Sequence, residues 1–164
     1  MRALALWLIL PAVASAAPAD PFAGLAFLAG EWTAGSGGGK PGEAVGGGFS
    51  LRPDLGGAVL VRRSRAEYAP RPGQARGEVH EDLMVIHREG AALKATYWDG
   101  EGHVIRYAVA TEPGRATFES EPGPGPRFRL VYEKKGEGEV SIAFLIAPPG
   151  KAFQPYVTGT ARRK

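Results

Sequence analysis

Turn residues divide the chain from Glu31 to Arg162 into short segments of regular length, and this division most constrains what it can fold into. Within the segments apolar and polar residues alternate, as at Phe128, Leu130 and Tyr132, which is the period of a β-strand with one buried face. Breaks containing Gly or Pro separate the segments at intervals of ~8–12 residues. The pattern predicts ten strands, at 31–36, 45–52, 57–68, 78–88, 92–99, 103–111, 115–121, 127–134, 139–147 and 153–162.

Nearly every connection between these strands is of hairpin length, so neighbours in sequence should pair as antiparallel neighbours. Closing a ten-strand meander removes its exposed edges. We therefore predict an all-β fold, a single antiparallel up-and-down barrel of about ten strands. The glycine-rich stretch 35–48 is expected to be either a flap near the barrel mouth or a disordered connection.

One short helix is predicted before the strands. Asp20-Pro21 has the form of an N-cap followed by Pro at the first helical position. Phe22, Leu25 and Leu28 then form an apolar stripe, and Gly30 stands where a C-cap belongs. We expect this helix to cap one end of the barrel.

The N-terminus has the pattern of a secretory signal peptide. Met1-Arg2 is positive, residues 3–14 are all apolar, and Ala14-Ser15-Ala16 offers small residues at a cleavage site. The apolar run is shorter than the ~20 residues that span a bilayer, and no second such run follows. We expect a signal peptide at 1–16 and a barrel domain at 17–164, located in the periplasm or secreted, with no integral membrane segment after cleavage.

Charge and cysteine content narrow the possible partners. The chain has 20 Lys and Arg against 17 Asp and Glu and contains no Cys. Without Arg2 the balance is 19 against 17, a net charge of +2, which does not indicate a nucleic-acid partner. Because no disulfide can form, stability must come from a continuous core.

The segment Phe27-Leu28-Ala29-Gly30-Glu31-Trp32 resembles the opening of calycin-type barrels, which include lipocalins, fatty-acid-binding proteins and nitrobindin-like proteins. The resemblance implies that Trp32 packs across the closed end of the barrel. A count of ten strands resembles the fatty-acid-binding or nitrobindin-like shape more than the lipocalin one. The stretches 80–85 and 97–103 are similar to exported bacterial members of unassigned function.

Two functional features of those families do not carry over. Nitrobindin-like proteins hold haem iron with a histidine late in the chain, and no histidine follows His103 here. Fatty-acid-binding proteins use an Arg-x-Tyr pair, whereas Arg129 and Tyr132 have a different spacing that places them on opposite faces of a strand. We therefore expect no haem and no other cofactor.

The three histidines show no metal-site spacing. His80 and His87 are seven residues apart, so they point to opposite faces of one strand. His80 and Asp82 share a face, and His103 begins another strand, so a His-Asp-His site is geometrically open but matches no recognised spacing. We predict neither a metal site nor a catalytic residue.

Three arginines fall in one apolar strand, with Arg62 on one face and Arg63 and Arg65 on the other. Either both faces are solvated at these positions, or one set points into the lumen. A lumenal arginine is costly unless paired. It would need Glu81 or Asp82 from the adjacent strand, or a carboxylate brought by a ligand.

The hairpin around Asp99-Gly100 predicts an aromatic-lined face. With a loop of two or of four residues, Trp98 and His103 share a face, and Ile105 and Tyr107 follow on it. Such a face lines a ligand cavity or fills a core.

These observations favour a barrel that binds a small, partly apolar or amphipathic molecule in its lumen. An alternative is a small barrel enzyme, an isomerase or hydrolase with a lumenal His–carboxylate pair. A third is a filled structural or interaction barrel. In the favoured interpretation the ligand-binding residues are Trp98, His103, Ile105, Tyr107, Arg62, Glu81 and Asp82.

Overall fold

The structure is a computed structural model that describes residues 20–35 and 44–164. The expected signal peptide at 1–16 and the expected mature start near Ala17 lie outside the described residues.

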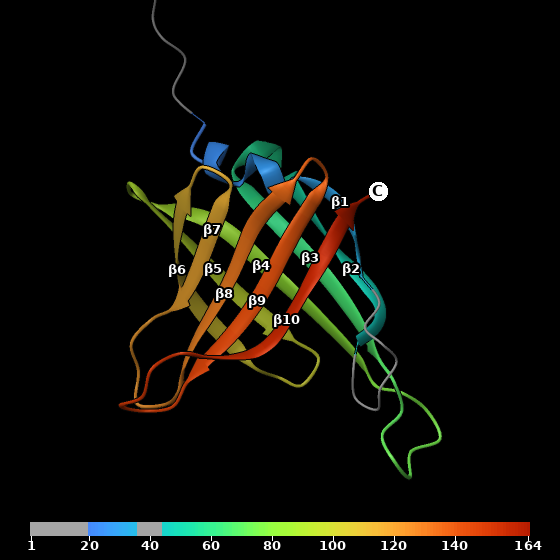
Figure 1. The fold of residues 1–164 in the computed structure, drawn as a ribbon. Helices are drawn as coiled ribbons and strands as arrows, with labels where there is room; N and C mark the ends of the chain where they lie inside the picture. Colours follow the sequence, from blue (N-terminus) through green and yellow to red (C-terminus); the bar gives the residue numbers. More distant parts are fainter. Residues whose placement is uncertain (1–19, 36–43) are drawn as a thin grey trace, which may run out of the picture.

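Ten antiparallel strands form one closed barrel (Figure 1). Each strand pairs with its sequence neighbours, and β1 closes the ring by pairing with β10. The predicted all-β, up-and-down barrel is confirmed. The strands are β1 (Gly30–Ala34), β2 (Ala44–Asp54), β3 (Val59–Tyr68), β4 (Val79–Glu89), β5 (Ala92–Asp99), β6 (Val104–Glu112), β7 (Arg115–Ser120), β8 (Arg127–Gly136), β9 (Glu139–Ala147) and β10 (Gln154–Arg163).

All ten predicted strands are present, and the differences lie at their ends. The break expected at Arg52 falls later, because β2 continues through Pro53, which pairs with Leu60. The turn itself is the 3-10 segment η2 (Leu55–Gly57), so β3 begins at Val59 rather than at 57.

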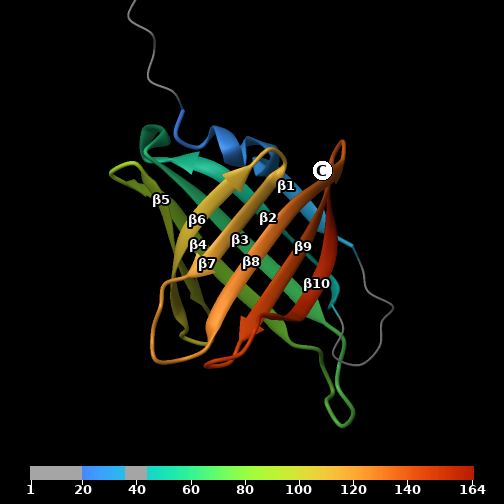
Figure 2. The ribbon, with the colours of Figure 1, turned by 60° about the vertical axis from the view of Figure 1, so that its left-hand side comes forward.

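The predicted helix exists as a short 3-10 helix, η1 (Ala23–Leu28), which lies across one end of the barrel (Figures 1 and 2). The Asp20 carboxylate accepts a hydrogen bond of 2.9 Å from the Phe22 N–H at its start. Gly30 is not its C-cap: Ala29 ends the helix, and Gly30, with φ of +107°, is the first residue of β1. In the described residues no helix has the length and apolar character needed to cross a membrane.

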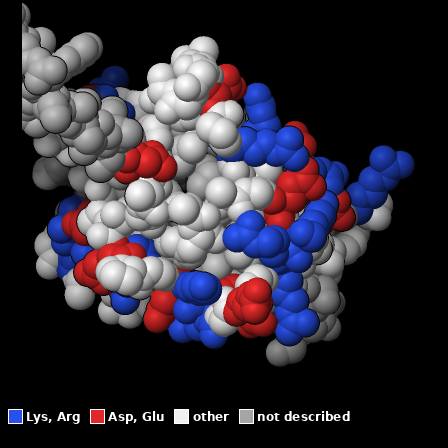
Figure 3. Space-filling model, turned by 90° about the horizontal axis from the view of Figure 1, so that it is seen from above, with Lys and Arg blue, Asp and Glu red and all other residues white. Residues whose placement is uncertain are grey.

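The helix end of the barrel is closed by packed side chains. Trp32 is 2% exposed, donates from its indole N–H to the Leu28 carbonyl at 2.9 Å and stacks on Phe49. Its expected position at the closed end of the barrel is confirmed. Seen from above, charged side chains of both signs surround uncharged ones at this end (Figure 3).

Glycines let β2 approach its neighbours. A Cβ at Gly48 would lie 2.1 Å from the Trp32 carbonyl oxygen, and one at Gly47 would lie 2.1 Å from that of Arg65. The end of the glycine-rich stretch, residues 44–48, is therefore paired strand rather than flap. Residues 36–43 lie outside the described residues.

Candidate functional site

The buried residues show which face of each strand points into the barrel. Met84 and Ile86 of β4, Ala95 of β5 and Tyr107 of β6 belong to the core cluster. By alternation, even-numbered residues of β4 and odd-numbered residues of β5 and β6 point inward.

Inward-facing side chains are most buried in the middle of the barrel and half-buried toward both ends, as Leu60, Leu93 and Val109 are at the η1 end. We call the part of the interior at the end opposite η1 the open end. The half-buried inward-facing side chains that define it are His80, Tyr97, Ile105, Phe128 and Phe144, and the buried carboxylates of Asp82 and Asp99 lie among them.

A buried ion pair forms the floor of the open end. Arg62 of β3 points inward and donates to Asp82 of β4 at 2.5 Å, with side chains only 10% and 7% exposed. Its guanidinium carbon lies 5.5 Å from the Phe49 ring centre and 5.9 Å from that of Tyr132. Burial disfavours the charged form, but the nearby Tyr132 and Asp82 outweigh this, so the pKa of Arg62 lies above its ordinary value. Of the alternatives that the sequence left open, the structure shows a lumenal arginine paired with Asp82.

Two buried donors beside this pair have no hydrogen-bond partner within the described part of the chain. They are Nε of Arg62 and the hydroxyl of Tyr132. A buried polar group left without a partner costs ~1–3 kcal/mol. An oxygen acceptor placed at the floor, from water or from a ligand, would remove this cost.

Above the floor, His80 and Tyr97 link the strands β4 and β5. The His80 ring contacts Glu101 through Nδ1 at 3.0 Å and the Tyr97 hydroxyl through Nε2 at 3.0 Å. The Tyr97 hydroxyl also donates to Asp99 at 3.3 Å. Burial is the main cause that raises the pKa of Tyr97 far above its ordinary value, and the carboxylates of Asp82 and Asp99 add to it.

Asp99 and His103 form a dyad at the edge of the open end. His103 Nδ1 lies 2.8 Å from Asp99 Oδ2, and the backbone N–H groups of Glu101 and His103 donate to Oδ1 at 3.1 and 2.9 Å. Burial of Asp99 opposes its ionisation. The backbone and ring hydrogen bonds of His103 outweigh this and hold the pKa of the carboxyl below its ordinary value. The Asp99 side chain is 4% exposed and that of His103 is 69% exposed, so the outer nitrogen of the imidazole faces solvent.

The opposite wall of the open end is apolar. Phe128 of β8 and Phe144 of β9 stack with ring centres 6.0 Å apart, and Tyr156 meets Phe144 edge-on at 6.3 Å. In the strand order these strands lie across the ring from β3 and β4, which carry Arg62 and Asp82. The open end therefore has one polar and one aromatic side.

The expectation that Trp98 and His103 share a face is wrong. Trp98 pairs with Val104, so the five residues 99–103 lie between this pair. The prediction assumed a connection with an even number of residues, two or four. The cause is the turn around the Asp99 carboxylate, which draws in two backbone N–H groups and makes the connection odd-numbered. Trp98 consequently points outward and is 40% exposed, and Tyr97 takes the inward position opposite Ile105.

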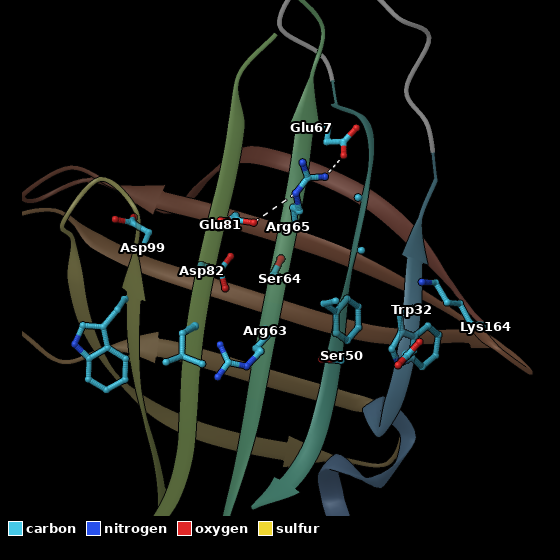
Figure 4. A pocket seen from close by; sticks show the side chains of 16 residues that line it. Trp32, Ser50, Arg63, Ser64, Arg65, Glu67, Glu81, Asp82, Asp99 and Lys164 are labelled. Atoms are coloured by element: carbon cyan, nitrogen blue, oxygen red, sulfur yellow. Dashed lines mark hydrogen bonds and ion pairs between the residues drawn. The ribbon is translucent and has the colours of Figure 1, made fainter.

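Glu81 also points outward. Its carboxylate lies 3.4 Å from Arg65 and is 69% exposed. With Trp98 it lines a shallow hollow on the outer face of strands β1 to β5, where Arg65 also pairs with Glu67 (Figure 4). Asp82 and Asp99, the strand neighbours of Glu81 and Trp98, are also among the residues that line this hollow.

The seven residues that the sequence singled out are thus divided between two faces. Arg62 and Asp82 pair at the floor of the open end, and Ile105 also points into the barrel there. His103 lies at the edge of the open end, and Tyr107 is 2% exposed within the core beneath it. Trp98 and Glu81 lie outside, as described above.

Sequence reasoning missed the polar link through Tyr97, Asp99 and Glu101 and the aromatic wall of Phe128 and Phe144. Two signals were present for them. Tyr97 and Asp99 share strand parity, and Phe128 and Phe144 fall in adjacent predicted strands with clean alternation.

The chain was compared with protein families and with curated proteins. No family model matches it, and no curated protein is significantly similar to it. The geometry of the open end is therefore what indicates the function.

Proposed function

We propose that this chain is an exported, calycin-type barrel that binds a small, partly apolar molecule at its open end. The observation that carries the proposal is the two-sided interior wall. Inward-facing polar residues on β3 to β5 lie across the barrel from inward-facing aromatic residues on β8 and β9. The polar side ends in half-buried His80 and Tyr97, and the aromatic side in half-buried Phe128 and Phe144. An apolar wall with a few convergent polar groups is the usual composition of a small-molecule site.

The unpartnered donors at the floor support this function and indicate the ligand chemistry. Arg62 is already neutralised by Asp82, so the floor does not demand an anion. It offers the Arg62 Nε–H and the Tyr132 O–H to a neutral oxygen acceptor such as a carbonyl or ether. An apolar body attached to that acceptor would then contact Phe128 and Phe144.

The calycin assignment is supported by Trp32 beneath a short N-terminal helix in a closed ten-strand antiparallel barrel. Export is supported by the positive, apolar and small-residue segments of residues 1–16.

Native mass spectrometry of the exported protein, purified from the periplasm, tests the binding function. We expect a non-covalent adduct in the wild type, lost in Phe144→Ala and retained in Phe153→Ala. Phe153 is a matched control because its ring packs on Arg127 and Arg129 of the outer face of β8. An adduct-free wild type, or an adduct equally present in Phe144→Ala, would count against the proposal.

A second candidate function, acid–base catalysis, is favoured by the Asp99–His103 dyad. A buried carboxylate bound to Nδ1 fixes the imidazole and leaves Nε2 as a general base. The test is hydrolysis of an activated aryl ester by wild type, His103→Ala and His87→Ala. If the dyad is catalytic, the wild type and His87→Ala should hydrolyse the ester and His103→Ala should not. Equal rates in all three proteins would eliminate this candidate.

A further inference from the structure

Three side chains with metal-ligating atoms meet at the open end. They are His80 of β4, Asp99 at the end of β5 and Glu101 in the following turn, and one donor atom from each lies within 4.8 Å of the other two. His80 Nδ1 and Glu101 Oε1 are 3.0 Å apart. Donor atoms held about 2.0–2.1 Å from a zinc ion have a similar separation, so small side-chain rotations would close the three around an ion.

The backbone holds these residues together independently of their side-chain contacts. The Gly100 N–H donates to the Glu81 carbonyl at 3.1 Å, which fixes the turn against the strand that carries His80. The Gly102 N–H donates to the Asp99 carbonyl at 3.2 Å and closes the turn. The convergence of a strand and a turn is therefore part of the fold.

The charge balance around these residues favours a cation. Asp82, Asp99 and Glu101 supply three negative charges against one positive charge on Arg62, a balance of −2 when the histidines are neutral. Asp82 Oδ2 lies 3.8 Å from His80 Nε2, so it belongs to the same group. The side chains of Asp82 and Asp99 are only 7% and 4% exposed, and water screens charges weakly there.

We propose that His80, Asp99 and Glu101 bind one divalent transition-metal ion of the zinc class. Imidazole and carboxylate donors suit such ions, and three protein ligands leave a fourth position open to water or ligand. Glu101 can only accept a hydrogen bond, so Nδ1 of His80 carries a proton in the metal-free contact. When the ion binds, the ring proton shifts from Nδ1 to Nε2, so the neutral imidazole presents Nδ1 to the ion and no net proton is released.

Tyr97 and His103 orient the ligands. The 3.3 Å bond from the Tyr97 hydroxyl is the longest one to Asp99, so it is the bond that the ion replaces. The hydroxyl then accepts from Nε2–H of His80, 3.0 Å away, and fixes the tautomer that presents Nδ1. His103 holds the Asp99 carboxylate at 2.8 Å. Binding of the ion needs no organic ligand, so its test is independent of the test of the proposed small-molecule binding.

The test is titration of the untagged, chelator-treated mature chain with ZnCl2 by calorimetry, repeated with CoCl2 by visible absorption. We expect one ion per chain in the wild type. His80→Ala should weaken binding by ~100-fold or more, since removing only an outer hydrogen-bond partner of a ligand costs 10–100-fold. His103→Ala should show that smaller loss.

His87→Ala is the matched control, because His87 is on the same strand but points outward. It should bind zinc as the wild type does. Glu101→Gln removes the carboxylate but keeps the shape of this half-exposed turn residue, so the variant should fold. It therefore tests zinc binding even if His80→Ala fails to fold. A wild type that binds no zinc, or Glu101→Gln with unchanged affinity, would overturn the proposal.

Discussion

The buried Arg62–Asp82 pair yields the sharpest stability prediction. Asp82→Ala leaves the guanidinium of Arg62 without its carboxylate in a site where the side chain is only 10% exposed. Removing one partner of a buried ion pair costs ~3–5 kcal/mol, because the remaining charge is uncompensated. A domain of this size has ~5–15 kcal/mol of total stability, so the loss should be a large fraction of it.

The assay is urea unfolding followed by circular dichroism, with Glu81→Ala as the matched control. Glu81 is the preceding residue of the same strand, and its ion pair with Arg65 is exposed. An exposed pair contributes only ~0–1 kcal/mol, so the control should unfold close to the wild type. The double variant Arg62→Met with Asp82→Leu should recover most of the stability, because apolar replacement of both partners removes the buried charge. Equal losses in Asp82→Ala and Glu81→Ala would refute the reasoning.

Three further outcomes are expected. Trp32→Ala should lower the free energy of unfolding by ~3–5 kcal/mol, measured in the same urea assay, and an unchanged midpoint would contradict its role at the closed end. The pKa of Asp99 is lowered in the folded state, so the ionised carboxylate stabilises the fold at pH values above the ordinary pKa of 3.8. This stabilisation is lost as the pH falls through the folded-state pKa. In Asp99→Asn the free energy of unfolding should therefore fall less steeply with decreasing pH below about pH 4 than in the wild type. An equally steep fall in both proteins would argue against this. Burial raises the pKa of Tyr107 and Tyr132, so spectrophotometric titration should show them ionising only as the barrel unfolds above about pH 10, and reversible ionisation of the folded protein would disagree.

Local patterns predicted the barrel because alternation and turn residues act over a few positions. The strand of Phe128, Leu130 and Tyr132 is an example, since its period is readable without knowledge of its partners. The same residues did not reveal that Phe128 would face the open end, because the depth of a residue in a barrel depends on the tilt and register of all the strands.

The candidate site was predicted only in part, and the reasons are non-local. Arginines stood on both faces of one strand, and only packing on Phe49 and pairing with Asp82 show that Arg62 is the inward one. The hairpin at 99–103 misled the assignment of Trp98 because its odd length arises from hydrogen bonds to the Asp99 side chain. Turn residues alone do not specify that length.

Binding at the open end is tested most directly by equilibrium titration of an apolar fluorescent probe into wild type, Phe144→Ala and Phe153→Ala. The proposed site predicts saturable one-to-one binding in the wild type and in Phe153→Ala. Phe144→Ala should bind about tenfold more weakly or worse, since a buried aromatic contact contributes ~1.5–3 kcal/mol. The same affinity in Phe144→Ala and Phe153→Ala, or no saturable binding in the wild type, would contradict the account.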